Sequence, residues 1–224
     1  KYSKLFDSVW VPGESGYELM RYFSVPSNQI FKGLYGSNEL VFTPGPSLIE
    51  RKKQLIFVGR LEKIKGIKEL ISAFNVLYKK DSEWSLVIFG KGSFSDKLSG
   101  IPGVTLNSFA SPDFIATCMK DSRFLVLPSH EDHWPLVVNE ASLCGCGMLL
   151  SSDVGNAKEF IGRSNGFSFK SKSSEALKKV LYKMSELTDD QISSISDESV
   201  ELGLKFTPRS TWGSVFDIIV KSLQ

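Results

Sequence analysis

The chain has 224 residues, of which 42% are hydrophobic and 23% charged. These proportions are typical of a globular protein and disfavour a disordered or fibrous one. The formal net charge of +2 is close to neutral, which disfavours a general nucleic-acid binder, because such proteins usually carry a strongly basic face. No run of 18 apolar residues occurs, so no membrane-spanning helix is predicted.

Three cysteines occur, at Cys118, Cys144 and Cys146. Their spacing matches no metal-ligand pattern, and an odd number of cysteines favours a reducing compartment. We therefore expect them to be buried structural residues.

The first 46 residues differ in pattern from the rest. The chain starts at Lys1 without an initiator Met or a long apolar segment, so we expect a piece of a longer protein. A strand is predicted within residues 5–11, a helix over 14–22 and a second strand within 29–35. Pro44-Gly45-Pro46 is typical of a linker. We interpret residues 1–46 as the tail of a preceding domain and its linker.

Short apolar runs alternate with longer amphipathic runs from residue 54 to residue 172. The predicted strands lie at 55–58, 85–89, 104–106, 124–127, 148–150 and 167–169, and the predicted helices at 66–78, 112–120, 135–144 and 157–161. The strands are apolar on both faces, as in a parallel sheet that helices cover on each side. Residues 47–205 are therefore predicted to form a doubly wound, Rossmann-like α/β domain, whose ligands bind at the carboxyl ends of the strands.

The end of the sequence is predicted to be helical. After Ser173 the apolar residues recur at helical spacing. Thr207 is a favourable N-cap and Pro208 a favourable first helical residue. Residues 206–224 are predicted to form a separate C-terminal helix.

Two glycine-containing turns follow predicted strands. Arg60 and Lys65 flank the turn after the first strand, and two cations beside the free N–H groups of a helix start suit a diphosphate. Two solvated cations on a loop would be the ordinary alternative. Gly90 and Gly92 follow the second strand, where glycine lets the backbone approach a ligand closely. By itself this pair indicates only a tight turn.

The segment 128–141 carries the richest chemistry. Asp132 precedes a helix predicted to start near Pro135, and Glu140 lies eight residues later, so the two acids could share one side of that helix. Glu140 stands in an otherwise apolar helix, where a carboxylate should have a partner, and ribose hydroxyls would serve. His130, Glu131, Asp132 and His133 are consecutive and cannot all reach one ion, so no metal site is expected.

Together these segments resemble the C-terminal domain of glycosyltransferase family 4, which has the GT-B fold. The resemblance rests on FVGRLEKIKGIKELISAF, on PSHEDHWPLVVNEASLCGCGMLLSSDVGNAKEFI and on GLYGSN near the start. The second segment is similar to the acidic-x7-Glu motif and the G-G-x-x-E segment after it. Two departures are Asp132 at a position where the family usually has Glu, with Glu131 adjacent as a competitor, and Pro135 where it often has Gly. The C-terminal helix resembles one that crosses back to the N-terminal domain.

The resemblance implies a retaining transfer of a hexose-type sugar from a UDP- or GDP-linked donor to a glycan or a lipid-linked acceptor. It implies no metal and no further cofactor. By motif match, Arg60 and Lys65 bind the diphosphate, Glu140 the ribose and Asp132 the sugar. Catalytic roles are assigned to Asp132, Arg60 and Lys65, and donor contacts to Arg60, Lys65, Gly90, Glu131, Asp132, Trp134, Pro135, Leu136 and Glu140.

The acceptor would bind mostly to an N-terminal domain outside this chain, so we expect the chain to bind donor without turnover. A cytoplasmic location is expected, with peripheral contact of the whole enzyme to the inner membrane surface left open. A nucleotide-sugar epimerase and a non-catalytic nucleotide-binding or interaction module remain as alternatives. A nicotinamide-binding domain is disfavoured, because the glycine fingerprint is absent.

Overall fold

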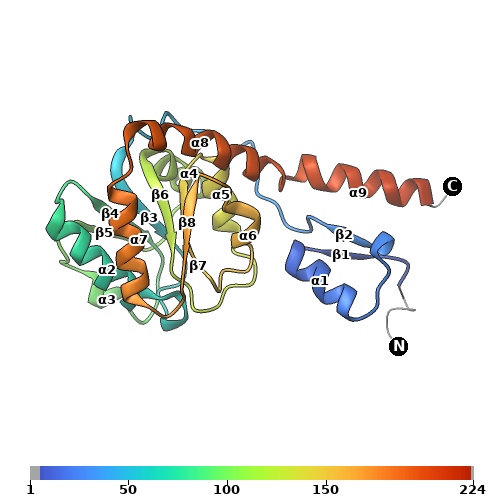
Figure 1. Cartoon of the computed structure of the whole chain (residues 1–224), viewed down its shortest axis with the longest axis horizontal. Coiled ribbons are helices and arrows are strands. Elements are labelled where there is room, and N and C mark those ends of the chain that lie inside the picture. Colours follow the sequence, from blue (N-terminus) through green and yellow to red (C-terminus); the bar gives the residue numbers. More distant parts are fainter. Residues whose placement is uncertain (1–5, 223–224) are drawn as a thin grey trace.

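A computed structural model describes residues 6–222 of the chain. Its main feature is a six-stranded parallel sheet with the order β5-β4-β3-β6-β7-β8 (Figure 1). The strands are β3 (Lys52–Val58), β4 (Ser85–Phe89), β5 (Val104–Asn107), β6 (Ser122–Leu127), β7 (Gly147–Ser151) and β8 (Gly166–Phe169). The predicted doubly wound, Rossmann-like α/β fold is confirmed.

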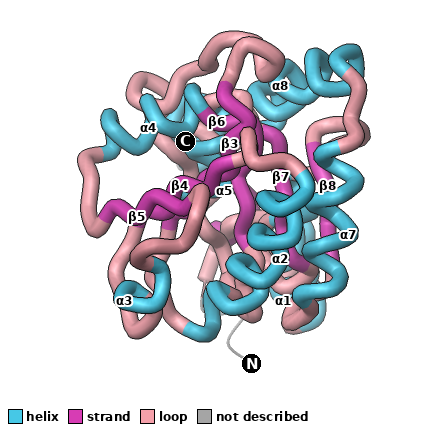
Figure 2. The backbone as a smooth tube through the Cα atoms, turned by 90° about the vertical axis from the view of Figure 1, so that its left-hand side faces the viewer, coloured by secondary structure: helices cyan, strands magenta, loops and turns pink. Residues whose placement is uncertain are grey.

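Helices cover both faces of this sheet (Figure 2). Helices α2 (Ile67–Lys80) and α7 (Ser174–Ser185) pack against each other, as do α5 (Leu136–Leu143) and α8 (Asp189–Leu204), while α4 (Pro112–Asp121) contacts β3 and β6. Two shorter helices are α3 (Ser95–Leu98) and α6 (Ala157–Phe160). Side chains on both faces are buried over Leu55–Phe57 in β3 and Phe124–Leu127 in β6, and the polar residues of these two central strands lie at their starts.

The strand order reverses direction at the centre of the sheet. The chain runs outward from β3 through β4 to β5, returns to β6 beside β3, and continues outward through β7 to β8. In such sheets the loops after the two central strands diverge, and ligands bind in the crevice between them. The loops after β3 and β6 are those that carry Lys65 and Asp132.

The N-terminal residues form a small separate unit, the head, with β1 (Val9–Val11), α1 (Glu14–Tyr22), a short 3-10 turn (Ser27–Gln29) and β2 (Ile30–Lys32). The two strands pair in parallel, and Val11, Val25 and Ile30 make their own apolar cluster. Both strands are shorter than predicted, because the pairing between them covers only Val9–Val11 and Ile30–Lys32. Leu5, in the first predicted strand, lies outside the described residues.

The chain ends in helix α9 (Pro208–Ser222). Thr207 Oγ1 accepts a hydrogen bond from the Ser210 N–H at 3.3 Å, so the predicted N-cap is confirmed. Figure 1 shows α9 extending away from the sheet, on the side of the head, and the rings of Trp10 and Trp212 meet edge to face at 6.5 Å. The domain boundaries after residues 46 and 205 stay predictions. Within residues 6–222, no helix is both long and apolar enough to cross a bilayer.

Candidate functional site

The turn after β3 brings two cations to the carboxyl edge of the sheet. A short 3-10 turn (Lys63–Lys65) ends at Gly66, which adopts a left-handed conformation with φ 70° and opens α2. A Cβ atom at Gly66 would lie 2.1 Å from the carbonyl oxygen of Pro128, just after β6. This close approach places Lys65 beside the loop that follows β6.

Lys65 and Asp132 contact each other. Lys65 Nζ lies 2.5 Å from Asp132 Oδ2, and both side chains are largely buried, with exposed fractions of 14% and 16%. The Asp132 backbone is fixed on both sides: its N–H donates to the carbonyl oxygen of Asp153, and its own carbonyl oxygen accepts from the N–H of Gly155. Two residues predicted to bind different parts of one ligand therefore meet at one point.

The four consecutive polar residues after Ser129 point to three different places. Asp132 faces Lys65, whereas Glu131 and His133 pair with each other on the surface at 3.4 Å. His130 is turned inward, with its Nε2 atom 3.2 Å from Glu69 Oε1, at an angle that makes no hydrogen bond. Glu131 therefore does not share the position of Asp132, and residues 6–222 contain no cluster of three metal-ligating side chains.

Helix α5 begins one residue later than predicted. Pro135, expected as the first helical residue, is the N-cap instead, with ψ 114°, and Leu136 is the first residue of the helix. Asp132 therefore precedes the helix and does not share a helical face with Glu140. Within the described residues, no acceptor is bonded to the N–H groups of Leu136 and Val137, which leaves both available to a negatively charged group.

The ring of Trp134 packs away from the surface, and the donor contact predicted for this residue stays a prediction. Its ring packs against Phe206 and Phe160, at centroid distances of 5.6 and 6.4 Å. A large aromatic group buries most area in this apolar contact. Sequence reasoning missed this because Phe160 and Phe206 are distant in the chain.

Glu140 projects from α5 as a nearly buried carboxylate. Among the described residues no hydrogen bond or ion pair reaches it, so the protein itself does not supply the partner expected for this carboxylate. Burial raises the pKa of Glu140 from 4.5 to about 7, because desolvation disfavours the charged form. An unpaired carboxylate at this edge is free to accept hydrogen bonds from hydroxyl groups of a ligand.

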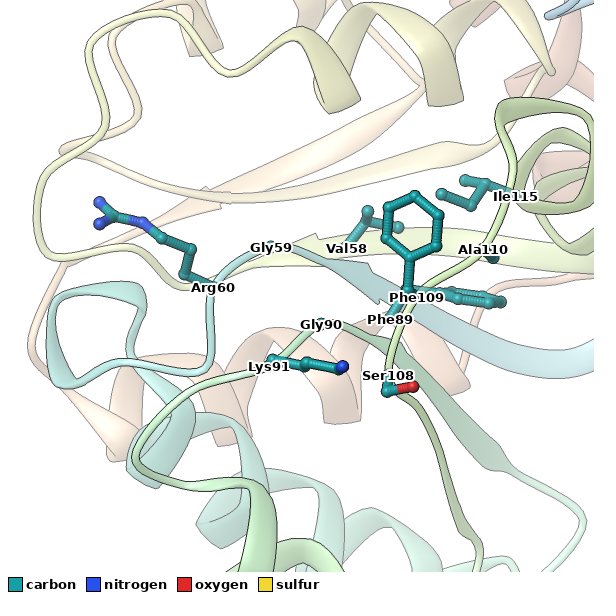
Figure 3. Close-up of a pocket in the computed structure, with 10 residues that line it drawn as sticks. All are labelled: Val58, Gly59, Arg60, Phe89, Gly90, Lys91, Ser108, Phe109, Ala110 and Ile115. Carbon is teal, nitrogen blue, oxygen red and sulfur yellow. The ribbon is translucent and has the colours of Figure 1, made fainter.

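A cavity of about 450 Å³ opens at the carboxyl ends of β3, β4 and β5 (Figure 3). Its lining residues are Val58, Gly59, Arg60, Phe89, Gly90, Lys91, Ser108, Phe109, Ala110 and Ile115. Figure 3 shows the Phe109 ring beside Ile115, while the guanidinium of Arg60 extends away from them. The wall is thus mainly apolar and aromatic, and Figure 3 shows the Lys91 ammonium directed toward Ser108.

Gly90 lines the cavity at a point where the turns after β3 and β4 come close together. A Cβ atom there would lie 1.9 Å from the carbonyl oxygen of Gly59, so only glycine lets the turns after β3 and β4 touch. Residues 108–110 were not singled out from the sequence. Their position directly after β5 could have placed them at the site, because the carboxyl ends of all strands in a parallel sheet lie along one edge.

With this geometry the chain can be compared with known proteins. The family model of glycosyl transferases group 1 matches residues 43–194, and the chain belongs to that family. It is 27% identical over 121 residues to an uncharacterized glycosyltransferase of Haemophilus influenzae, and 31% identical over 117 residues to one of Methanocaldococcus jannaschii. These alignments cover 51% and 49% of this chain, and 34% and 30% of the relatives. The matched part is thus about a third of the relatives' length.

Solved structures show the same fold. Anabaena HepE in complex with UDP has a TM-score of 0.80 at 15% identity, covering 98% of this chain and 65% of that one. Sucrose-phosphate synthase of Thermosynechococcus elongatus has a TM-score of 0.74 at 16% identity, covering 98% and 61%. The C-terminal domain of a group 1 glycosyl transferase from Francisella tularensis has a TM-score of 0.66 at 21% identity, covering 77% and 99%. The expected GT-B architecture with its Rossmann-like domain is confirmed.

Proposed function

We propose that this chain is the donor-binding part of a retaining glycosyltransferase that uses a nucleoside-diphosphate sugar. The observation that carries the proposal is the Lys65–Asp132 contact, which lies at the same carboxyl edge of the sheet as the cavity lined by Arg60. An aromatic and apolar cavity next to cations fits a nucleobase joined to a diphosphate. UDP is the first nucleotide to test, because similar structures such as HepE and the pneumococcal O-GlcNAc transferase GtfA are complexes with UDP.

Each part of the donor then has a place in the proposal. The base would lie against Phe109 and Ile115 in the cavity, and the ribose hydroxyls would donate to Glu140. The diphosphate would meet Arg60, Lys65 and the free N–H groups of Leu136 and Val137, and the transferred sugar would contact Asp132. This division uses Arg60, which makes no ion pair in the described residues, together with the free N–H groups of Leu136 and Val137 and the Glu140 carboxylate.

The proposed reaction breaks the bond between the anomeric carbon and the diphosphate oxygen. The bonding pair stays on that oxygen, the acceptor oxygen forms the new glycosidic bond on the same face of the sugar, and the acceptor's hydroxyl proton passes to the departing diphosphate. Negative charge therefore grows on the phosphate in the transition state. Arg60, Lys65 and the start of α5 would stabilise it, as fixed cations and dipoles do at other sites. Removing one of them should slow the transfer by roughly 100-fold to 1000-fold.

Several finer assignments stay part of this proposal. A hexose-type sugar, a glycan or lipid-linked acceptor bound mainly by parts of the protein outside this chain, and a reaction without a metal follow from the family resemblance. The relatives are about three times longer than the matched region, which supports placing acceptor recognition elsewhere. Addition of EDTA to the full-length enzyme tests the metal-free assignment, since transfer should persist.

Calorimetric titration with UDP, GDP and dTDP tests the donor site directly. We expect one nucleotide to bind and the binding to be lost in the Arg60→Ala/Lys65→Ala double variant. Lys63→Ala is the matched control, because Lys63 is an exposed cation in the same turn, and it should bind like the unchanged chain. Absence of binding to all three nucleotides would overturn the donor assignment.

A further inference from the structure

The N-terminus of helix α1 is capped by a residue from another part of the chain. The N-cap position of α1 is Gly13, which has no side chain to accept from the first N–H groups. Instead, Glu159 Oε1 accepts a hydrogen bond from the backbone N–H of Glu14 at 2.8 Å, across 145 residues. A carboxylate is the favoured group at a helix N-terminus, because it satisfies an unpaired N–H and complements the helix dipole.

The backbone at Gly13 lies too close to Glu159 and Trp134 for a side chain at this position. A Cβ atom at Gly13 would lie 2.4 Å from Glu159 Oε1 and 2.4 Å from the ring of Trp134. The glycine therefore brings the backbone of the head directly against both side chains. The second oxygen of Glu159 is buried without a hydrogen-bond partner among the described residues, so the carboxylate is held in this position by its contact with α1.

Glu159 and Trp134 both belong to the framework that carries Asp132. Trp134 follows Asp132 by two residues in the same loop. Glu159 lies in α6, directly after the segment whose Asp153 carbonyl oxygen and Gly155 N–H bond the backbone of Asp132. The segment from Asp153 to Glu159 therefore contacts both the backbone of Asp132 and the start of α1.

We propose that Glu159 is a positioning residue that caps α1 in trans and thereby holds the head, residues 9–32, in one orientation against the Asp132 loop. The missing side chain at Gly13 lets the start of α1 lie directly against Glu159 and the ring of Trp134. The importance of the contact for sugar transfer depends on the proposed function, whereas the docking of α1 does not. The head then reaches the proposed donor site through Glu159, without touching the nucleotide cavity.

Hydrogen exchange of the backbone amides at the start of α1, combined with calorimetric binding of UDP, tests this inference. Glu159→Ala and Gly13→Ala should each speed exchange at residues 14–16 at least tenfold. Glu159→Gln should give an intermediate rate, since its amide oxygen still accepts but carries no charge. Lys158→Ala, an exposed neighbour in α6, is the matched control and should leave exchange at α1 unchanged.

Two further readouts separate the possible outcomes. Exchange in β3 and β6 should be unchanged in all variants, which shows that the fold is intact, and Gly13→Ala provides a second route if Glu159→Ala fails to fold. UDP binding should stay within about twofold, because the cavity lies away from α1. Unchanged exchange at residues 14–16 in both variants would overturn the inference. Absence of UDP binding in the unchanged chain would instead count against the proposed function alone.

Discussion

The ammonium group of Lys65 and the carboxylate of Asp132 are 2.5 Å apart, although they follow different strands, β3 and β6. The proposed diphosphate-binding cation is thus already paired with the proposed sugar-binding acid. A nucleotide that binds Lys65 has to compete with this carboxylate. The pair also keeps each charge compensated in a largely buried setting, where an isolated charge would be unfavourable.

Asp132→Asn should strengthen UDP binding while it abolishes sugar transfer by the full-length enzyme. The substitution removes the ion pair that Lys65 must otherwise break before it can bind phosphate. Breaking such a pair costs about 1 kcal/mol, so UDP affinity should rise about fivefold. Calorimetry of the chain with UDP measures this change. Glu131→Gln, which removes a neighbouring charge that pairs only with His133, should leave the affinity unchanged. Weaker UDP binding in Asp132→Asn would contradict competition between the two groups.

Glu140→Gln should make the folded chain more stable at pH 8. Burial raises the pKa of Glu140 from 4.5 to about 7, so the folded state holds this proton in a range where the unfolded state releases it. Stability from this group is therefore complete below pH 4.5 and is lost as the pH rises to about 7. The difference corresponds to about 3 kcal/mol, and the neutral amide avoids it.

Denaturant unfolding at pH 4.5 and pH 8 measures this effect. The two proteins should be nearly equal at pH 4.5, and the variant more stable at pH 8. The same variant should bind UDP more weakly, since the ribose loses a charged acceptor. A variant that is less stable than the unchanged chain at pH 8 would show that the Glu140 carboxylate has a stabilising role in the fold.

Phe109→Ala should weaken UDP binding without loss of stability. Phe109 is 86% exposed and lines the cavity, so its ring is available for stacking on a base while contributing little to the core. Aromatic stacking on a base is worth about 1–3 kcal/mol, which predicts a loss of roughly fivefold to 150-fold in affinity. Calorimetry gives the affinity and thermal unfolding the stability. Unchanged UDP affinity would place the base outside this cavity.

Gly90→Ala should destabilise the fold. The new methyl group would meet the carbonyl oxygen of Gly59 at 1.9 Å, so the turns after β3 and β4 must move apart, at a cost of about 1–3 kcal/mol. Gly213→Ala is a suitable control, because nothing lies within 4 Å of its Cβ position in α9. That control should be neutral or slightly stabilising by helix propensity. Thermal unfolding compares the two variants, and an equal effect would argue against the close approach at Gly90.

The fold could be predicted from the sequence because its signals are local. Strands that are apolar on both faces indicate a parallel sheet covered by helices. Short right-handed connections then leave only a few possible strand orders. The predicted ends of helices are less accurate where contacts with distant residues determine them. Pro135 satisfies the rule for a first helical residue, yet it serves as the N-cap, and its carbonyl oxygen accepts from Asn156 Nδ2 at 3.1 Å.

The site was only partly predictable, since contacts between distant segments leave little trace in a sequence. The turn with Arg60 and Lys65 and the loop with Asp132 do lie at one edge of the sheet, as the topology requires. The direct pairing of Lys65 with Asp132, the inward packing of Trp134 and the cap that Glu159 supplies to α1 depend on three-dimensional placement. The roles of these residues in donor binding stay predictions.

Arg60 differs from Lys65 in its exposure to solvent and in having, among residues 6–222, no carboxylate partner at ion-pair distance. Its side chain is exposed, and no ion pair compensates it within the described part of the chain. Glu62, two residues along, lies near enough for Arg60 to help lower its pKa, so the charge is only partly offset. An exposed cation at the rim of a cavity attracts an anion from several ångströms away, and salt weakens this attraction. Under the proposed function, Arg60 governs how often a nucleotide arrives, whereas Lys65, released from its carboxylate, governs how long it stays.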